Sequence, residues 1–497
     1  MFTPVILAID EGTTNAKAIA VDASGHILAK ASVALRVSHP EPGRAEQDAM
    51  AIWQAVRQAV EACLASQRRV RIAGIAISNQ RESVVIWDRQ SGRPLTPLVS
   101  WQDRRSERFC QALKGSAEAL LIEQRTGLPL DPLFPAAKIH SMLADLPDGM
   151  ARASQGALCI GTVDCWLNWR LSGGRIFSTD YSNAARTQLF DIHRGCWDED
   201  LLALFSIPSV CLPVVTPSAA LQGHTALTDI EGLPAGVPIV ALIGDSHAAL
   251  YGQGSNQSGE IKATYGTGSS LMTTIARPYA NNHGLSTTIA WHDGELRYAL
   301  EGNITHTGSG FAWIGAMLGI PSLPQLTELA LGAASNQNVF FVPALSGLGA
   351  PHWDTQARGM LCGLTDAATP AVIARAGLES IAYQIADVFF AMEQASGCAL
   401  PALRVDGGAT QNRWLMQFQA DLLQRPLIRN HNAEVSALGA AYLGGKALGW
   451  WQSGEQLAAL PRDVEYIEPC TANASAVQAS YQRWQSAVAR ARYQPEQ

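Results

Sequence analysis

The segment Pro238-Ile-Val-Ala-Leu-Ile-Gly-Asp-Ser-His-Ala-Ala-Leu-Tyr-Gly252 decides how this chain is expected to fold. Residues 239–243 form a short apolar run, which is typical of a strand buried in a parallel sheet. Gly244 ends the run, Asp245 follows it, and the next residues are small and compatible with a helix. Such a strand delivers a carboxylate to the sheet edge where α/β enzymes bind ligands. Asp is also a favoured helix N-cap, so this segment alone leaves a catalytic and a capping role open for Asp245.

Length and composition narrow the class of protein. The chain has 497 residues, enough for two large domains or more, and its content of 47% hydrophobic and 16% charged residues is typical of a globular protein with a sizeable core. A net charge of −7 argues against nucleic acid as the main partner. The nine cysteines form no CxxC pair and suit a reducing cytoplasm. No apolar run approaches the length of a membrane span, so we expect no membrane partner.

Two similar turns mark the two halves of the chain. Residues 4–28 read as three strands, and the first turn between them is Asp10-Glu-Gly-Thr-Thr-Asn15, closely followed by Lys17. Backbone amides, threonine hydroxyls and a lysine at such a tip can hold a phosphate, although an ordinary polar hairpin is the alternative. The pattern returns at mid-chain, where Tyr265-Gly-Thr-Gly-Ser269 separates two strand-like segments. We therefore predict duplicated α/β halves that face each other across a cleft.

A third glycine-bearing turn occurs late in the chain. The segment Asp406-Gly-Gly-Ala-Thr-Gln-Asn412 follows a short apolar strand and leads into a predicted helix over residues 413–423. Glycines at a helix N-terminus let the backbone approach an anion closely, and the helix dipole favours negative charge there. A plain strand-to-helix turn is the alternative.

Polar side chains also gather just after other predicted strands. Arg81 and Glu82 follow the apolar strand over residues 72–77, and Trp101 and Asp103 follow the next hairpin. A bidentate donor, two acceptors and an aromatic wall would suit a ligand with many hydroxyl groups. A surface ion pair beside a core tryptophan is the alternative for the same residues.

In combination, these segments resemble the FGGY family of carbohydrate kinases, and within it the glycerol kinases. The matching segments run in family order from about residue 4 to about residue 450. They are Ile9-Asp-Glu-Gly-Thr-Thr14, Ser78-Asn-Gln-Arg-Glu82, Trp101-Gln-Asp-Arg-Arg105, Gly161-Thr-Val-Asp164, Gly244-Asp245, Tyr265-Gly-Thr-Gly268, Gly347-Leu-Gly-Ala-Pro351, Asp406-Gly-Gly-Ala409 and Glu434-Val-Ser-Ala-Leu-Gly-Ala-Ala-Tyr442. Because each segment is short, their number and order carry the resemblance.

The resemblance implies an α/β fold with two ribonuclease-H-like domains of the actin-like ATPase type. We expect residues 1–253 to form an N-terminal domain with the sugar or polyol site and the first phosphate loop, and residues 254–497 to form a C-terminal, nucleotide-binding domain. In the cleft between them, ATP with Mg²⁺ would phosphorylate a terminal hydroxyl of a polyol or sugar. The resemblance alone also implies a homo-oligomer, either a dimer or a tetramer.

The resemblance also assigns roles to individual residues. Asp245 takes the place of the general base, which orients the acceptor hydroxyl and accepts its proton, and Asp10 takes the place of the carboxylate that holds Mg²⁺. The implied substrate-binding residues are Arg81, Glu82, Trp101, Asp245 and Ser246. The implied ATP-binding residues are Thr13, Thr14, Asn15, Lys17, Thr267, Gly308, Gly408 and Asn412.

The sugar pocket departs from that of the glycerol kinases. Leu133, Ser246 and Ser270 stand where those enzymes have tyrosine, glutamine and phenylalanine. A wider pocket with an added hydroxyl predicts a linear substrate of four or more carbons, with glycerol a poor substrate. Glycerol kinase activity proper is one alternative, and an actin-like ATPase or sensor that phosphorylates no small molecule is another. The retained polyol-binding residues favour a kinase.

Overall fold

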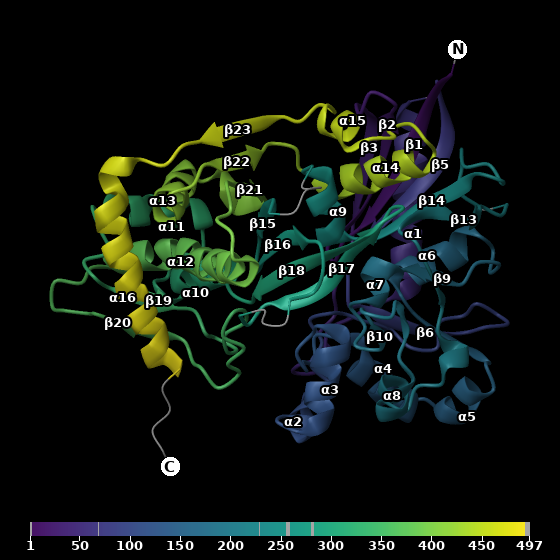
Figure 1. Cartoon of the computed structure of the whole chain (residues 1–497), viewed down its shortest axis with the longest axis horizontal. Coiled ribbons are helices and arrows are strands. Elements are labelled where there is room, and N and C mark those ends of the chain that lie inside the picture. Colours follow the sequence, from purple (N-terminus) through teal and green to yellow (C-terminus); the bar gives the residue numbers. More distant parts are fainter. Residues whose placement is uncertain (1, 68, 228, 255–258, 280–282, 493–497) are drawn as a thin grey trace.

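The computed structural model describes residues 2–67, 69–227, 229–254, 259–279 and 283–492. The chain forms two lobes, each built on a central β-sheet (Figure 1). The first half of the chain, purple to teal, makes up one lobe, and most of the second half, green to yellow, makes up the other. This is the two-domain α/β arrangement that the sequence predicts.

The first lobe contains a six-stranded sheet with the strand order β13-β14-β5-β1-β2-β3. The strands are β1 (Thr3–Glu11), β2 (Asn15–Asp22), β3 (Ile27–Ala34), β5 (Val70–Asn79), β13 (Ala219–His224) and β14 (Pro238–Gly244). Helices α1 (Ala49–Ser66) and α6 (Val163–Leu171) cover one face, and α9 (Asp245–Gly252) and α14 (Val435–Ala447) cover the other. Leu7 of β1 faces the first layer, and Ile6 and Ala8 face the second. Burial on both faces explains why the strands are continuous apolar runs.

A smaller sheet, with the order β4-β7-β6-β8, lies beside the first one. Its strands are β4 (Glu46–Gln47), β6 (Val84–Asp88), β7 (Leu98–Val99) and β8 (Leu158–Thr162). The helices in this part of the lobe are α2 (Glu107–Leu113), α3 (Ala117–Thr126), α4 (Pro135–Asp145), α5 (Gly149–Ser154), α7 (Tyr181–Ala184) and α8 (Glu199–Leu204). Since β5 and β6 belong to different sheets, the turn between them, which carries Arg81 and Glu82, is anchored at both ends.

The second lobe repeats the strand pairing of the first. Its sheet has the order β17-β18-β16-β15-β21-β22-β23. The strands are β15 (Ile261–Tyr265), β16 (Ser269–Ile275), β17 (Ser286–His292), β18 (Leu296–Ile304), β21 (Leu403–Asp406), β22 (Leu427–Asn430) and β23 (Val464–Ile467). Strand β15 pairs antiparallel with β16 and parallel with β21, just as β1 pairs antiparallel with β2 and parallel with β5. The predicted duplication of the two halves is confirmed.

Helices pack around the second sheet. They are α10 (Gly308–Met317), α11 (Leu323–Gly332), α12 (Pro370–Ser396), α13 (Arg413–Leu423) and α16 (Ala474–Arg492). The long helix α12 starts where the Thr369 side chain accepts a hydrogen bond from the Val372 amide, and it ends at Gly397, whose φ of 67° suits glycine. Trp484 of α16 stacks on Tyr383 of α12 with ring centroids 5.3 Å apart, which fixes the C-terminal helix to the core.

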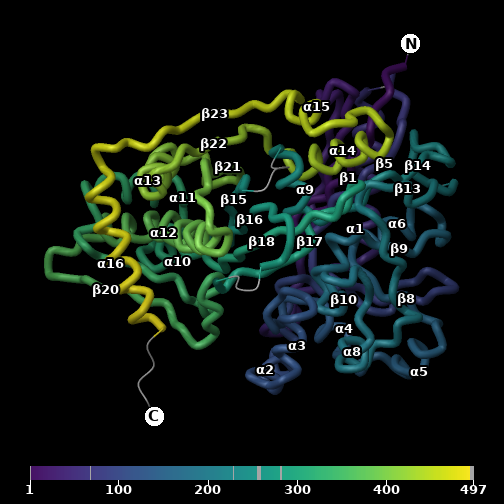
Figure 2. Tube along the Cα trace, viewed as in Figure 1, coloured from purple at the N-terminus to yellow at the C-terminus, as the bar shows by residue number. Residues whose placement is uncertain are grey.

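Two segments of the second half also pack on the first lobe. In Figure 2 the yellow chain around α14 and α15 (Gly454–Ala458) crosses the first lobe before β23 leads back to α16. Helix α14 contacts β1, β5 and β14, and the β17–β18 hairpin contacts α7. The domain boundary that the sequence predicts after residue 253 falls directly after α9 and stays a prediction. One hydrophobic cluster contains residues from both sides of this boundary, so the cores of the two lobes are continuous.

Candidate active site

The carboxyl edge of the first sheet brings three polar segments together. In the parallel pairs, Asp10 of β1 lies opposite Ser78 of β5, and Ile243 of β14 lies opposite the same serine. The chain then continues from β14 through Gly244 to Asp245, at the start of α9. Because this register ends all three strands at one edge, Asp10 and Asp245 lie at the same side of the cleft.

Asp245 is the first residue of α9 and does not cap it. The N-cap position is Gly244, and no side chain makes a capping hydrogen bond. The Asp245 Oδ1 atom accepts a hydrogen bond from the Ser246 amide at 2.6 Å and lies 3.3 Å from Arg81 Nε. The Asp245 side chain is 36% exposed, whereas the side chains of Arg81, Glu82 and Glu301 are at most 7% exposed. Burial in the cleft raises the pKa of Asp245, the Arg81 guanidinium opposes that rise, and Glu82 adds to it.

Asp10 is a buried carboxylate with an unused oxygen. Its Oδ1 atom is shielded from water and accepts no hydrogen bond. Burial raises the pKa of Asp10 to about 6, and the nearby Ser78 hydroxyl and the charge of Lys17 limit the rise. Among the described residues, no three or more His, Cys, Asp or Glu side chains cluster in a way that could hold a metal ion by themselves. A single carboxylate such as that of Asp10 is nevertheless enough for Mg²⁺, which proteins commonly bind through one or two carboxylates together with substrate phosphates and water.

The β1–β2 turn is held by one local hydrogen bond and by contacts with two distant residues. Trp101 Nε1 donates to Thr13 Oγ1 at 2.9 Å, and Asn15 Nδ2 donates to Thr14 Oγ1 at 3.1 Å. Lys17 Nζ lies 2.9 Å from Glu434 Oε2 at the start of α14. A bound phosphate would compete with Glu434 for the lysine.

The β15–β16 turn packs against the N-terminus of α10. The Thr267 carbonyl accepts hydrogen bonds from the amides of Thr307 and Ser309 at 3.1 and 3.0 Å, and the Gly308 amide donates to the Gly266 carbonyl at 3.1 Å. A Cβ on Gly308 would come within 2.6 Å of that carbonyl oxygen. Gly308 therefore permits close packing of helix and turn, and its own N–H is already used.

The turn after β21 is exposed to solvent at both of its glycines. Gly407 has a φ of 97°, and a Cβ there would lie 2.3 Å from the Tyr265 carbonyl oxygen. A Cβ on Gly408 would meet nothing within 4 Å. Asn412 caps α13 because its side-chain oxygen accepts a hydrogen bond from the Leu415 amide at 3.1 Å. The turn thus combines a position that requires glycine, a second glycine with open space around it and a capped helix N-terminus, as an anion site needs.

Arg81 and Glu82 form part of a buried network of ion pairs. Arg81 Nη2 donates to Glu301 Oε1 at 2.7 Å, and Glu82 Oε1 accepts from Arg186 Nε at 2.6 Å. Glu82 has a φ of 58°, a left-handed backbone that non-glycine residues seldom adopt. Sequence reasoning missed Arg186 and Glu301, because no local pattern links either residue to partners more than a hundred positions away.

Trp101 and Asp103 differ in what they can offer a ligand. The Trp101 side chain is 37% exposed, so it is not the core tryptophan that was one of the alternatives. Asp103 is fully buried, lies 2.8 Å from Arg105 Nε and accepts a hydrogen bond from the Ala45 amide. The hypothesis that Asp103 contributes to a polyol site is therefore wrong, because its oxygens are committed to a structural ion pair.

Glu11 lies next to Asp10 and faces a buried amide network. Gln80 Nε2 donates to Glu11 Oε1 at 2.9 Å and to Gln47 Oε1 at 2.8 Å, and Gln47 Nε2 donates to the Thr13 carbonyl. Burial raises the pKa of Glu11 to about 8, although the hydrogen bonds with Gln80 oppose the rise. The protonated, neutral form of Glu11 is thus favoured at neutral pH.

The raised pKa of Glu11 predicts a pH dependence of stability. Between the unfolded pKa of 4.5 and the folded value of about 8, the folded state binds the extra proton, so stability falls as pH rises through this interval. Glu11→Gln keeps the shape of the side chain and removes its titratable group. We expect it to be as stable as the wild type near pH 5 and more stable by a few kcal/mol near pH 8 in thermal unfolding. Parallel pH profiles for the two proteins would contradict this expectation.

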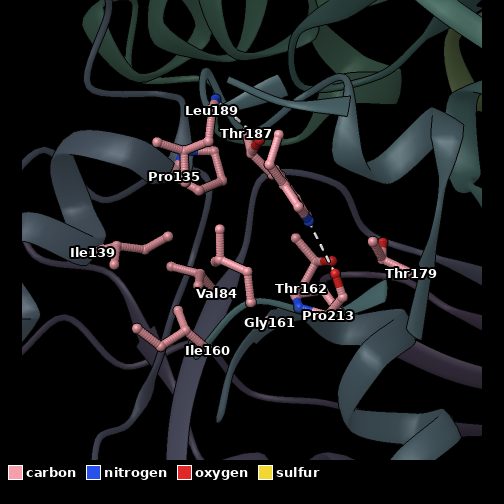
Figure 3. Close-up of a pocket in the computed structure, with 12 residues that line it drawn as sticks. Val84, Pro135, Ile139, Ile160, Gly161, Thr162, Thr179, Thr187, Leu189 and Pro213 are labelled. Atoms are coloured by element: carbon pink, nitrogen blue, oxygen red, sulfur yellow. Dashed lines mark hydrogen bonds between the residues drawn. The ribbon is translucent and has the colours of Figure 1, made fainter. Parts of the chain in front are cut away.

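Neither of two cavities in the first lobe is the site. One, drawn in Figure 3, is a small pocket of about 10 Å³ lined mostly by apolar residues, where the Trp197 indole donates to the Pro213 carbonyl. It has room for one water molecule and no sugar. The other, of about 540 Å³, is lined by several arginines, of which Arg104 and Arg105 form ion pairs with neighbouring carboxylates. The candidate active site is instead the open sheet edge around Asp10 and Asp245.

Comparison with known proteins identifies the family of the chain. Residues 5–252 match the N-terminal domain and residues 261–448 the C-terminal domain of the FGGY family of carbohydrate kinases. The chain belongs to the FGGY family. FGGY kinases use ATP with Mg²⁺, and this FGGY kinase is therefore an ATP-dependent enzyme that phosphorylates a sugar or polyol.

Three relatives illustrate the range of the similarity. The chain is 80% identical to an apulose kinase from Pectobacterium atrosepticum, over 100% of both chains, and 45% identical to a glycerol kinase from Dechloromonas aromatica, over 98% of this chain and 97% of the other. The structure of Plasmodium falciparum glycerol kinase with ADP superposes with a TM-score of 0.92 at 30% identity, over 99% of both chains. The actin-like fold of this FGGY kinase is thereby confirmed, and the alternative of an ATPase or sensor without a small-molecule substrate is set aside.

Proposed function

We propose that this FGGY kinase phosphorylates apulose, with Asp245 as the general base and Mg²⁺·ATP as the phosphoryl donor. The observation that carries the catalytic part is Asp245 itself, a partly exposed carboxylate at the carboxyl edge of the sheet, 3.3 Å from Arg81. The 80% identity to an apulose kinase supports the substrate. Apulose is a branched ketose, so the proposal replaces the linear skeleton expected from the sequence.

In this proposal one set of residues binds the sugar and another set binds ATP and Mg²⁺. Arg81, Glu82 and Trp101, with Ser246 beside the base, bind the sugar hydroxyls, and Asp245 orients the acceptor hydroxyl and takes its proton late in the transfer. Thr13, Thr14, Asn15, Lys17, Thr267, Gly308, Gly408 and Asn412 surround ATP, and Asp10 holds Mg²⁺. Bound Mg²⁺ would neutralise charge on the phosphates during transfer.

A polar face of the second sheet supports a substrate larger than glycerol. Ser270 of β16 lies opposite Asn303 of β18, so both side chains project from one face, together with Glu301 two residues before Asn303. Glu301 reaches Arg81, so this face looks towards the sugar site. The Ser270 hydroxyl is shielded from water and has no hydrogen-bond partner. A hydroxyl or carbonyl oxygen of a ketose would supply that partner.

Filling this space should change substrate preference. We expect Ser270→Phe to lower kcat/KM for apulose by about tenfold or more, because the ring excludes a sugar group and leaves its hydrogen bond unmade. Ser270→Ala, which removes the hydroxyl without adding bulk, should have a smaller effect. Steady-state kinetics with apulose and glycerol measure both. An unchanged ratio of the two kcat/KM values in Ser270→Phe would show that the sugar does not reach β16.

The experiment that tests the function is an ATP-consumption screen with the background ATPase subtracted. Apulose, glycerol and linear ketoses and polyols of four and five carbons are compared by kcat/KM. The proposal expects apulose to be preferred and glycerol to be poor. A clear preference for glycerol would favour glycerol kinase proper instead.

Location and assembly are part of the proposal. Within the described ranges, no helix is both long and apolar enough to span a lipid bilayer. The scattered cysteines, several of them buried, support a reducing cytoplasm. We propose self-association as a dimer or tetramer, and no nucleic-acid or membrane partner. Sedimentation of the purified protein tests the oligomeric state.

A further inference from the structure

A continuous chain of charged side chains runs behind the proposed sugar site. In order of contact, its members are Glu82, Arg186, Glu301, Arg81 and Asp245. The first three contacts are short, at 2.6 Å, 2.6 Å and 2.7 Å, and the last is 3.3 Å. The two ends of the chain are thus a proposed sugar ligand and the proposed general base.

The inner members of the chain have almost no access to solvent. The side chains of Arg186 and Glu301 are 1% and 0% exposed, against 36% for Asp245. Glu301 divides its two oxygens between the two arginines, which hold its pKa well below the usual range. His247, beside the chain, has its pKa lowered well below the usual value by burial and by Arg81, so it is neutral and supplies no competing charge.

Such a network is a poor device for stability alone. Taking charges out of water is unfavourable, and apolar residues of similar volume often replace a buried ion pair without loss of stability. The geometry of the network is better suited to orienting the side chains of Glu82 and Arg81. Arg186 holds the carboxylate of Glu82, whose backbone is in the left-handed region, and Glu301 fixes the guanidinium of Arg81 beside Asp245.

The network also joins the two halves of the chain. Glu301 belongs to β18 of the second sheet, and both arginines belong to the first lobe. In Figure 1 the β17–β18 hairpin reaches from the second sheet towards α7 and α9. Met272, opposite Glu301 on β16, packs in one core with residues of α9 and α14. Glu301 is therefore presented from a firmly packed surface, as an orienting group requires.

We propose that Arg186 and Glu301 are positioning residues of the sugar site, which hold Glu82 and Arg81 in the geometry that binds the substrate. This inference rests on the proposed function, since it takes Arg81, Glu82 and Asp245 as the groups that meet the sugar. Neither Arg186 nor Glu301 touches the substrate.

Two variants test the role, and in both of them each remaining charge keeps an oppositely charged neighbour, since Glu82 also lies 4.0 Å from Arg81. Glu301→Gln keeps the shape of the side chain, and the double variant Arg186→Met with Glu301→Met removes one charge of each sign. Kinetics in apulose and in ATP, and thermal shifts with each ligand alone, are measured for both. Lys446→Met is the matched control, because Lys446 Nζ lies 2.5 Å from Asp293 and also ties the β17–β18 hairpin to α14, away from the sugar site.

The two substrates should respond differently. We expect kcat/KM for apulose to fall by about 10- to 100-fold in both variants, since small misplacements of binding groups have effects of this size. The KM for ATP should stay within about twofold, the thermal shift with Mg²⁺·ATP should persist, and the shift with apulose should disappear. Lys446→Met should match the wild type.

Two results would overturn the positioning role. One is wild-type kinetics for apulose in the double variant, which would make the network merely structural. The other is an equal loss for apulose and ATP in Glu301→Gln, which would indicate general damage. A wild-type enzyme that neither phosphorylates nor binds apulose would instead refute the proposed substrate, so the two failures are distinguishable.

Discussion

Asp245→Asn is expected to lower kcat by about 10²-fold or more, the usual scale for the loss of a positioned acid–base group. The amide keeps the size of the side chain but cannot accept the proton of the acceptor hydroxyl. It also removes the negative charge 3.3 Å from Arg81 Nε. The measurement is steady-state turnover with saturating apulose and ATP, combined with the thermal shift by Mg²⁺·ATP, which should be unchanged.

The control for this variant is Asp293→Asn. Asp293 is also a carboxylate paired with a cation, in this case Lys446, and its replacement should leave turnover near the wild-type value. Near-normal turnover in a folded Asp245→Asn enzyme would remove Asp245 from the chemistry and direct attention to another carboxylate at the same edge.

Asp10→Asn is expected to lower kcat/KM by about 10²-fold, with partial recovery at high Mg²⁺ concentration. The reason is that Asp10 offers a buried carboxylate oxygen without a hydrogen bond, close to Asp245 and Lys17, and an amide oxygen carries no charge for the cation. Titration of activity with Mg²⁺ at fixed ATP measures the effect.

Glu11→Gln is the matched control, since it changes the neighbouring residue in the same way. Glu11 faces the amide network of Gln80 and favours its neutral form, so the substitution should leave the Mg²⁺ dependence unchanged. If Asp10→Asn and Glu11→Gln showed the same Mg²⁺ dependence as the wild type, Asp10 would not hold the cation.

Prediction from the sequence succeeded where the signal is local. The apolar run before Asp245 and the glycine turns at Gly12 and Gly266 each occupy a few consecutive residues, so their strands and hairpins could be predicted together with the duplication. Prediction failed for Asp103, whose place after a strand resembles that of Glu82. The difference between the two lies in their partners, Arg105 for one and Arg186 for the other.

What the sequence by itself determined is the family, the two-lobed fold and the position of Asp10 and Asp245 at strand ends, because apolar periodicity and turn residues encode strands and their ends locally. Only the tertiary structure decided that Arg186 and Glu301 pair with Glu82 and Arg81 and that α14 returns to the first sheet. These contacts join residues far apart in the chain. They depend on strand order and on the packing of one lobe against the other, which no local pattern specifies.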